Sequence, residues 1–110
     1  MMNASNTAIA GAAQVVMQPD AAEYCDAHAL VDLVALRAQI ASHHFMLAGP
    51  IEVELETDPD SDEQRPILNL SVCGDLDLVQ EQYRAYVAEW VRRVSPDRSL
   101  LIGTFINMFC

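Results

Sequence analysis

The sequence predicts an α+β domain: a three-stranded, mostly antiparallel sheet with two helices packed on one face, in the order helix, strand, strand, helix, strand. Two short neighbouring segments alternate strictly between apolar and polar residues, as half-buried strands do, and one longer segment places apolar residues at helical spacing. A chain of 110 residues is the usual size of one domain. We expect residues 1–19 to form a flexible N-terminal tail and residues 20–110 the single domain.

The first element is expected to be one long helix over residues 20–46, a segment without proline or glycine and rich in alanine and leucine. Asp20 and Glu23 have the spacing of a capping box at its start. Apolar residues occupy much of its circumference, so the helix should contact more than one surface. The sequence "AGP" at positions 48–50 ends it.

Two strands follow, "IEVELE" at 51–56 and "PILNLSVCG" at 66–74, and their closeness favours an antiparallel hairpin. The connection, "ETDPDSDEQ", has acidic residues at every second position and resembles a calcium loop. The position that should be glycine is Glu63, however, and the last ligand position is Asn69 inside a strand. We therefore predict a solvated turn whose side-chain oxygens accept from backbone amides, with weak cation binding as the alternative.

The second helix is predicted from Val79, Tyr83, Tyr86, Val87, Trp90 and Val94, which fall on one stripe. Asp77 and Gln80 have capping-box spacing at its start, and Ser95-Pro96 ends it. The aromatic residues of the stripe, Tyr83, Tyr86 and Trp90, are expected to anchor the core rather than to form a stacking platform.

Residues 100–109, "LLIGTFINMF", predict a third strand that is apolar on both faces. One face would carry Ile102 and Ile106, and the other Leu101, Phe105 and Phe109. Because two helices cover only one face of the sheet, one of these rows should mark an association surface. We expect a homodimer through this strand, with these five residues as the interface candidates; the alternative is that the first helix or the tail covers the exposed row.

The strand order is left with two alternatives. The third strand runs antiparallel beside the first, giving the order 2-1-3, or parallel beside the second. We favour the first arrangement.

Sixteen acidic side chains stand against six basic ones, a formal charge of −10, and every basic residue is arginine. The absence of lysine excludes enzymes that depend on a phosphate-binding or Schiff-base lysine. The charge disfavours nucleic acid and anionic membranes as partners and suits a basic partner protein, although a solubilising surface is the commoner reason for it. No apolar run is long enough to span a membrane, and no signal peptide is recognisable. We expect a cytoplasmic protein without a cofactor.

Cys25, Cys73 and Cys110 are too few and too scattered for a secreted disulfide framework, so we expect reduced thiols. No residue is assigned as catalytic, cofactor-binding or metal-binding. The alternative is a small enzyme or metal-binding protein that uses Cys73 with His28, His43 or His44. On one continuous helix, His28 and His43 would lie about 22 Å apart, too far for one metal ion.

The segment from "IEVELETDPDSDEQ" through "LNLSVCGDLDLVQEQYRAYVAEWVRRV", residues 51–94, is similar to small uncharacterised prokaryotic proteins with an acidic strand, a D-P-x-S/T-x-E turn and a helix carrying Tyr and Trp. The resemblance implies a bacterial, cytosolic protein and no particular activity. We expect a non-catalytic protein that acts through protein–protein interaction, as an antitoxin-like or inhibitor-like partner of a basic protein.

Overall fold

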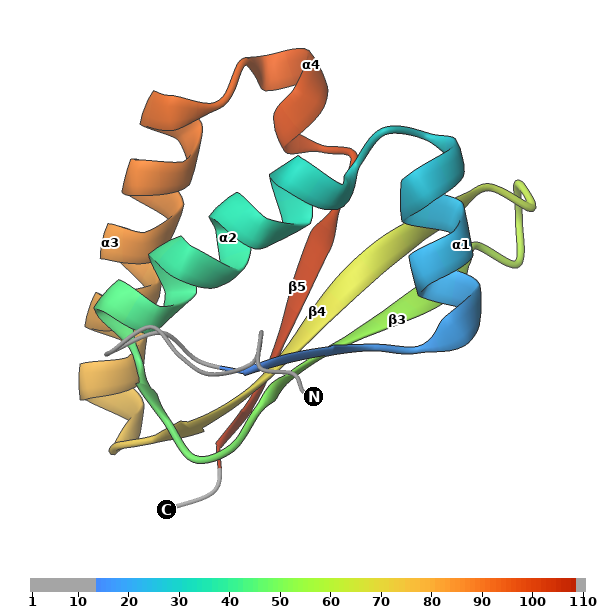
Figure 1. The fold of residues 1–110 in the computed structure, drawn as a ribbon. Helices are drawn as coiled ribbons and strands as arrows, with labels where there is room; N and C mark the ends of the chain where they lie inside the picture. Colours follow the sequence, from blue (N-terminus) through green and yellow to red (C-terminus); the bar gives the residue numbers. More distant parts are fainter. Residues whose placement is uncertain (1–13, 109–110) are drawn as a thin grey trace.

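The computed structural model describes residues 14–108 and shows an α+β fold with a mixed sheet (Figure 1). The described elements are β1 (Val15–Met17), α1 (Pro19–Ala27), α2 (Val31–His44), β2 (Met46–Leu47), β3 (Ile51–Thr57), β4 (Gln64–Cys73), α3 (Leu76–Arg93), α4 (Pro96–Ser99) and β5 (Gly103–Met108). None of the helices in this part of the chain has the length and hydrophobicity needed to cross a membrane.

The sheet is built around the hairpin of β3 and β4, which confirms the two predicted strands. Within the described residues the sheet has five strands rather than three. β1, at the end of the segment expected to be a tail, runs parallel to β3. β5 runs parallel to β4, so the favoured order 2-1-3 is wrong and the alternative is observed. The reason is that α3 runs back along the sheet and returns the chain to the end where β4 begins. β5 therefore starts at the same end as β4 and runs in the same direction.

The predicted helix over residues 20–46 is wrong in one respect, because it breaks at residues 28–30 into α1 and α2. Ala29 has a φ of 57°, and the amide of Leu30 donates to the carbonyl of Cys25 at 2.8 Å. The break lets α1 pack on β3 while α2 packs on α3. The start of α1 also differs from the expected capping box, because Pro19 is in its first turn and Asp20 follows it.

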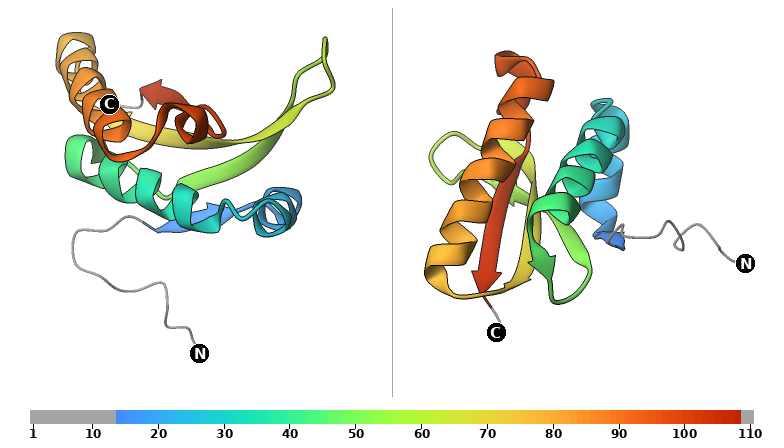
Figure 2. Two further views of the ribbon diagram at one scale, coloured as in Figure 1. Left: turned by 90° about the horizontal axis from the view of Figure 1, so that it is seen from above. Right: turned by 90° about the vertical axis from the view of Figure 1, so that its left-hand side faces the viewer.

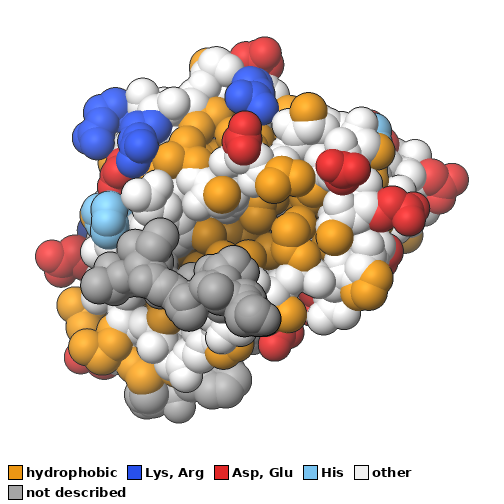
Figure 3. Space-filling model, in the orientation of Figure 1, with side chains coloured by type: hydrophobic (Ala, Val, Ile, Leu, Met, Phe, Trp, Pro, Cys, Tyr) orange, Lys and Arg blue, Asp and Glu red, His pale blue; other side chains and the backbone are white. Residues whose placement is uncertain are grey.

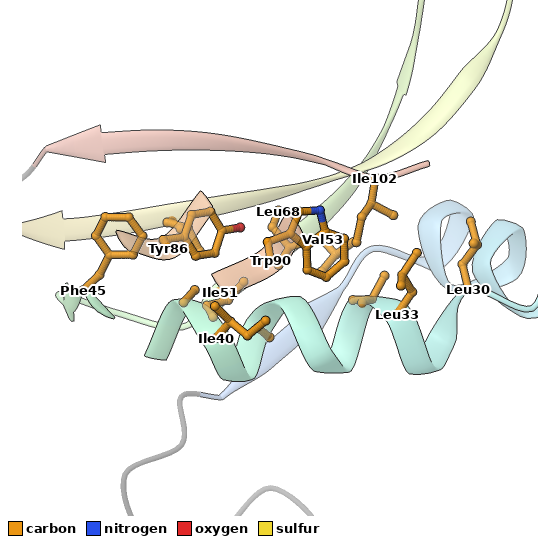
Figure 4. Close-up of a cluster of buried hydrophobic side chains, with 14 of the residues drawn as sticks. Leu30, Leu33, Ile40, Phe45, Ile51, Val53, Leu68, Tyr86, Trp90 and Ile102 are labelled. Carbon is orange, nitrogen blue, oxygen red and sulfur yellow. The ribbon is translucent and has the colours of Figure 1, made fainter. Parts of the chain in front are cut away.

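The hydrophobic core lies between the sheet and the helices. Alternate residues of β3 and β4, such as Val53 and Leu68, are fully buried and face side chains of α2 and α3 (Figure 4). Helices α2 and α3 pack against each other, and both views of Figure 2 show them next to the sheet. Tyr86 and Trp90 from α3 are 0% and 3% exposed, whereas Tyr83 is 42% exposed and lies outside the core. Tyr83 was expected there because the apolar stripe on α3 is wider than the face that the core covers.

The opposite face of the sheet carries the acidic side chains of β3, which are exposed as the alternation predicts. On the same face, Gly103 in β5 faces Ile67 of β4. A Cβ at position 103 would lie only 2.7 Å from Ile67 Cδ1. The absence of a side chain at Gly103 therefore lets Ile67 pack against β5, and Ile67 is only 9% exposed.

The acidic connection between β3 and β4 is a turn, as predicted. Asp58 Oδ1 accepts from the amide of Asp60 at 2.8 Å, and the amide of Asp58 donates to the carbonyl of Glu63 at 2.8 Å. The start of α3 differs from the prediction. Asp75, not Asp77, is the N-cap, and its side chain accepts from the amide of Leu78 at 2.9 Å.

Candidate functional site

The cysteine and histidine residues considered from the sequence do not form one site among the described residues. His28 follows α1 and His44 ends α2, so the 14 residues of α2, roughly 21 Å of helix, separate them. His44 Nε2 lies 2.7 Å from Glu89 Oε1, and His43 is exposed. The expectation of reduced thiols is wrong for Cys73, which is disulfide-bonded. Within residues 14–108 no cluster of three metal-ligating side chains occurs.

A buried arginine joins α2, α3 and β5. Arg37 is 8% exposed, and its Nε lies 2.7 Å from the hydroxyl of Tyr86 and 2.8 Å from that of Thr104. Its Nη1 donates to the carbonyl of Ile102 at 3.4 Å, and its guanidinium carbon lies 4.4 Å from the centre of the Trp90 ring. We call Arg37, Tyr86, Trp90 and Thr104 the arginine hub.

The arginine hub holds its positive charge with neutral groups. In the part of the chain that the structure describes, no carboxylate forms an ion pair with Arg37; hydroxyls, a carbonyl and an aromatic face surround it instead. Burial raises the pKa of Tyr86, an effect that the nearby Arg37 partly offsets. The Tyr86 hydroxyl therefore stays protonated at neutral pH and contributes a dipole, not a charge. These contacts hold the first residues of β5 against the two long helices.

A groove of about 920 Å³ lies between α1, the β3–β4 hairpin and the chain before β5. We call it the hairpin groove. Tyr24 and His28 stack at its α1 side with ring centres 4.1 Å apart, and the Tyr24 hydroxyl donates to the carbonyl of Gln64 at 2.9 Å. Leu100 and Leu101 come from the other end of the sequence and line it with apolar surface. The groove thus combines an aromatic stack with aliphatic side chains.

Carboxylates dominate the charge of the hairpin groove. Glu56, Asp58 and Glu63 line it, against a single guanidinium, that of Arg65. Arg65 Nε lies 4.0 Å from Glu56 Oε1, with both side chains at least half exposed. The space-filling view shows acidic side chains gathered on the side of α1 and the hairpin, and basic ones near the end of α3 (Figure 3). The hairpin groove can therefore accept a cation that also presents apolar or planar surface.

A second groove, of about 630 Å³, runs between α3 and β5. Four residues of each element line it: Val79, Gln80, Tyr83 and Arg84 from α3, and Thr104, Phe105, Ile106 and Met108 from β5. We call it the edge groove, because β5 pairs only with β4 among the described strands.

The five expected interface residues have different positions. Phe105 is 57% exposed and lines the edge groove, together with the partly buried Ile106. Ile102 is 2% exposed, because it lies in the core beside the arginine hub, and is not available to a partner. Leu101 is 43% exposed and lines the hairpin groove instead. Phe109 lies outside the described residues.

Comparison of the chain with protein-family models, curated proteins and solved structures finds no match.

Sequence reasoning missed the arginine hub and both grooves. A signal for the hub was present in the sequence, because Arg37 lies on the apolar face of its helix. It is three residues from Val34 and four from both Leu33 and Ala41. No comparable signal existed for the hairpin groove. It depends on α1 and on Leu100 and Leu101, which lie about 70 residues further along the chain.

Proposed function

We propose that this protein is a non-catalytic interaction protein that binds a basic segment of another protein in the hairpin groove, as an antitoxin-like or inhibitor-like partner would. The observation that supports the proposal is the lining of the groove, in which three carboxylates stand beside an aromatic stack and aliphatic side chains. These are the three kinds of surface that an arginine or lysine side chain contacts.

The aliphatic part of a basic side chain fits the apolar lining of Leu30, Leu100 and Leu101. The face of a guanidinium fits the Tyr24 ring, through a cation–π contact. Its charge is then close to the carboxylates, which accept charge-assisted hydrogen bonds. Arg65 Nε lies 4.0 Å from Glu56 Oε1, so one carboxylate of the groove already faces a guanidinium. Arginine suits the groove better than lysine because its planar group can stack and donate at the same time.

The charge of the whole chain supports the same kind of partner. A formal charge of −10 on 110 residues attracts a basic protein over several ångströms and raises the rate of encounter. Surface attraction of this type weakens with added salt. Binding through the hairpin groove should therefore depend strongly on ionic strength.

The test is a titration of the full chain with a fluorescent peptide of alternating arginine and glycine, followed by anisotropy at low and at physiological salt. The reference peptide replaces each arginine with citrulline, which has the same shape and no charge. We expect saturable binding of the arginine peptide only. Glu56→Gln combined with Glu63→Gln should weaken it about tenfold or more, which corresponds to about 1.4 kcal/mol.

The matched control removes the same charge elsewhere, with Glu52→Gln on the open face of the sheet and Glu81→Gln on α3. Both residues are exposed and neither lines the hairpin groove. This control should weaken binding much less than the groove variant. Equal weakening in the two double variants would show that only net charge matters, and equal affinity for the citrulline peptide would also contradict the proposal.

A further inference from the structure

Helix α3 has a second apolar row beside the one that enters the core. Leu76, Tyr83 and Val91 are 57%, 42% and 58% exposed, and Val87 between them is partly buried. With Gln80, these residues follow each other at spacings of four, three, four and four residues, so they lie on one face of the helix. We call this row the outer stripe. Three large apolar side chains exposed on one face are typical of a surface that meets another surface.

The outer stripe lies next to the edge that β5 forms in the described sheet. Gln80 and Tyr83 of the stripe line the edge groove together with β5. β5 is six residues long and pairs with β4 on one side, while no described strand pairs with its other side. Backbone groups on such an edge form hydrogen bonds with an added strand. The middle of the stripe and the edge of β5 therefore line the same groove.

The charge of this surface distinguishes it from the rest of the molecule. None of the eight residues that line the edge groove is acidic, and one of them, Arg84, is basic. Two copies of a chain with a formal charge of −10 repel each other unless they meet where acidic groups are few. The edge groove is such a place, whereas the hairpin groove has three carboxylates. The charge therefore favours a second copy of the chain here.

The outer stripe is also complementary to itself. Consider two α3 helices packed antiparallel about a two-fold axis that passes between Tyr83 and Arg84. Residue i of one helix then faces residue 167 − i of the other. Leu76 then faces Val91 of the partner subunit, and Gln80 faces the partner's Val87. Tyr83 faces the partner's Arg84, a pair that can form a cation–π contact. One axis can serve both elements, because the middle of α3 and the middle of β5 line the same groove.

We propose that the chain forms a two-fold homodimer in which β5 pairs antiparallel with β5 of a second copy and the two outer stripes pack together. The interface is isologous, so the same residues are used twice. It differs from the association surface expected from the sequence, because it uses the edge of the sheet and α3 rather than the open face of the sheet.

Light scattering during gel filtration tests the assembly. The wild-type chain at tens of micromolar should have a mass of about 24 kDa, twice the 12.1 kDa of one chain. Leu76→Glu and Val91→Glu place charge in the stripe without touching the core, and each should return the mass to that of one chain with unchanged circular dichroism. The control is Leu78→Glu on the same helix: Leu78 is 45% exposed and lies outside the stripe, so the dimer should persist.

A cross-linking experiment tests the pairing itself. Chains with Leu76→Cys mixed with chains with Val91→Cys should form a covalent dimer under mild oxidation, because these positions face each other. Either variant alone, or Leu78→Cys mixed with Val91→Cys, should give much less. A monomeric wild-type chain would overturn the proposal, and so would a dimer that resists both glutamate variants. A monomer that instead binds an extended peptide of another protein along β5 would assign the edge groove to that partner.

Discussion

The arginine hub and the hairpin groove hold guanidinium groups in opposite ways. Arg37 is buried, bound by neutral oxygens and covered by aromatic rings, whereas Arg65 is about half exposed and lies beside a carboxylate. A charge in the interior depends on every hydrogen bond that it makes, because water cannot replace a lost partner. An exposed ion pair is weak because water screens and solvates both groups. The two regions should therefore respond very differently to the loss of one partner.

The largest effect is expected at Trp90. Replacing Trp90 with alanine removes a buried aromatic side chain and the ring that lies 4.4 Å from the guanidinium carbon of Arg37. We expect a loss of about 3–5 kcal/mol in the free energy of unfolding, measured by urea denaturation. Trp90→Phe, which keeps most of the volume, should lose considerably less. A stable, folded alanine variant would show that the core does not depend on this ring.

A smaller loss is expected at Tyr86. Tyr86→Phe keeps the ring and removes the hydroxyl that lies 2.7 Å from both Arg37 Nε and Thr104 Oγ1. Because the lost hydrogen bond involves a buried charge, the free energy of unfolding should fall by about 1.5–3 kcal/mol. Tyr83→Phe is the matched control, since Tyr83 is 42% exposed, and it should change stability by less than about 0.5 kcal/mol. Equal losses in the two variants would contradict the role given to the hub.

The next effect, at Glu89, is expected to be smaller than that at Tyr86. It makes the stability of the protein depend on pH. Hydrogen bonds from His44 and Arg93 hold the pKa of Glu89 below its ordinary value of 4.5. Between the lowered pKa of the folded state and the ordinary pKa, Glu89 binds fewer protons in the folded protein than in the unfolded chain. The stability contributed by the ionised Glu89 carboxylate is complete above the ordinary pKa. It is lost as the pH falls through the lower pKa of the folded state.

Glu89→Gln should therefore flatten the acid branch of the plot of melting temperature against pH. The difference between the variant and the wild type should be largest near neutral pH and should shrink on acidification. A constant difference from neutral pH to pH 3 would contradict this assignment.

The smallest effect is expected at Glu56, the carboxylate beside Arg65. Both side chains are at least half exposed and their closest atoms are 4.0 Å apart, so the ion pair should contribute less than about 1 kcal/mol. Thermal unfolding of Glu56→Gln should be close to that of the wild type. This result would also show that the binding experiment on the hairpin groove uses a folded variant. A loss as large as that of Tyr86→Phe would erase the distinction between the two regions.

The elements with strong local patterns were predictable from the sequence. The alternation in β3 and the helical spacing in α3 identify both elements close to their observed bounds. The break between α1 and α2 was not predictable in the same way. Its left-handed residue is Ala29, and neither glycine nor proline marks the position. Only the packing of α1 on β3 and of α2 on α3 explains the turn.

Relations between distant segments could not be derived from local patterns. The alternation in β5 is compatible with either neighbour, and its parallel position beside β4 follows from the path of α3. The turn chemistry of the acidic connection was predicted, but the hairpin groove was not, because Leu100 and Leu101 complete it from a remote part of the chain. Tyr83 shows the limit of a helical stripe: periodicity identifies an apolar face, not which surface it meets.

The two parallel strand pairs have a consequence for how the chain folds. Val15 pairs with Ile51 and Ile67 pairs with Gly103, so both pairings close loops of 36 residues (51 − 15 and 103 − 67). The β3–β4 hairpin closes over a short turn and involves contacts close in sequence. Loop closure over longer segments costs more entropy, and distant contacts slow folding. We expect the hairpin to form early and to act as a template, with β1 and β5 joining its two sides in a later, slower step.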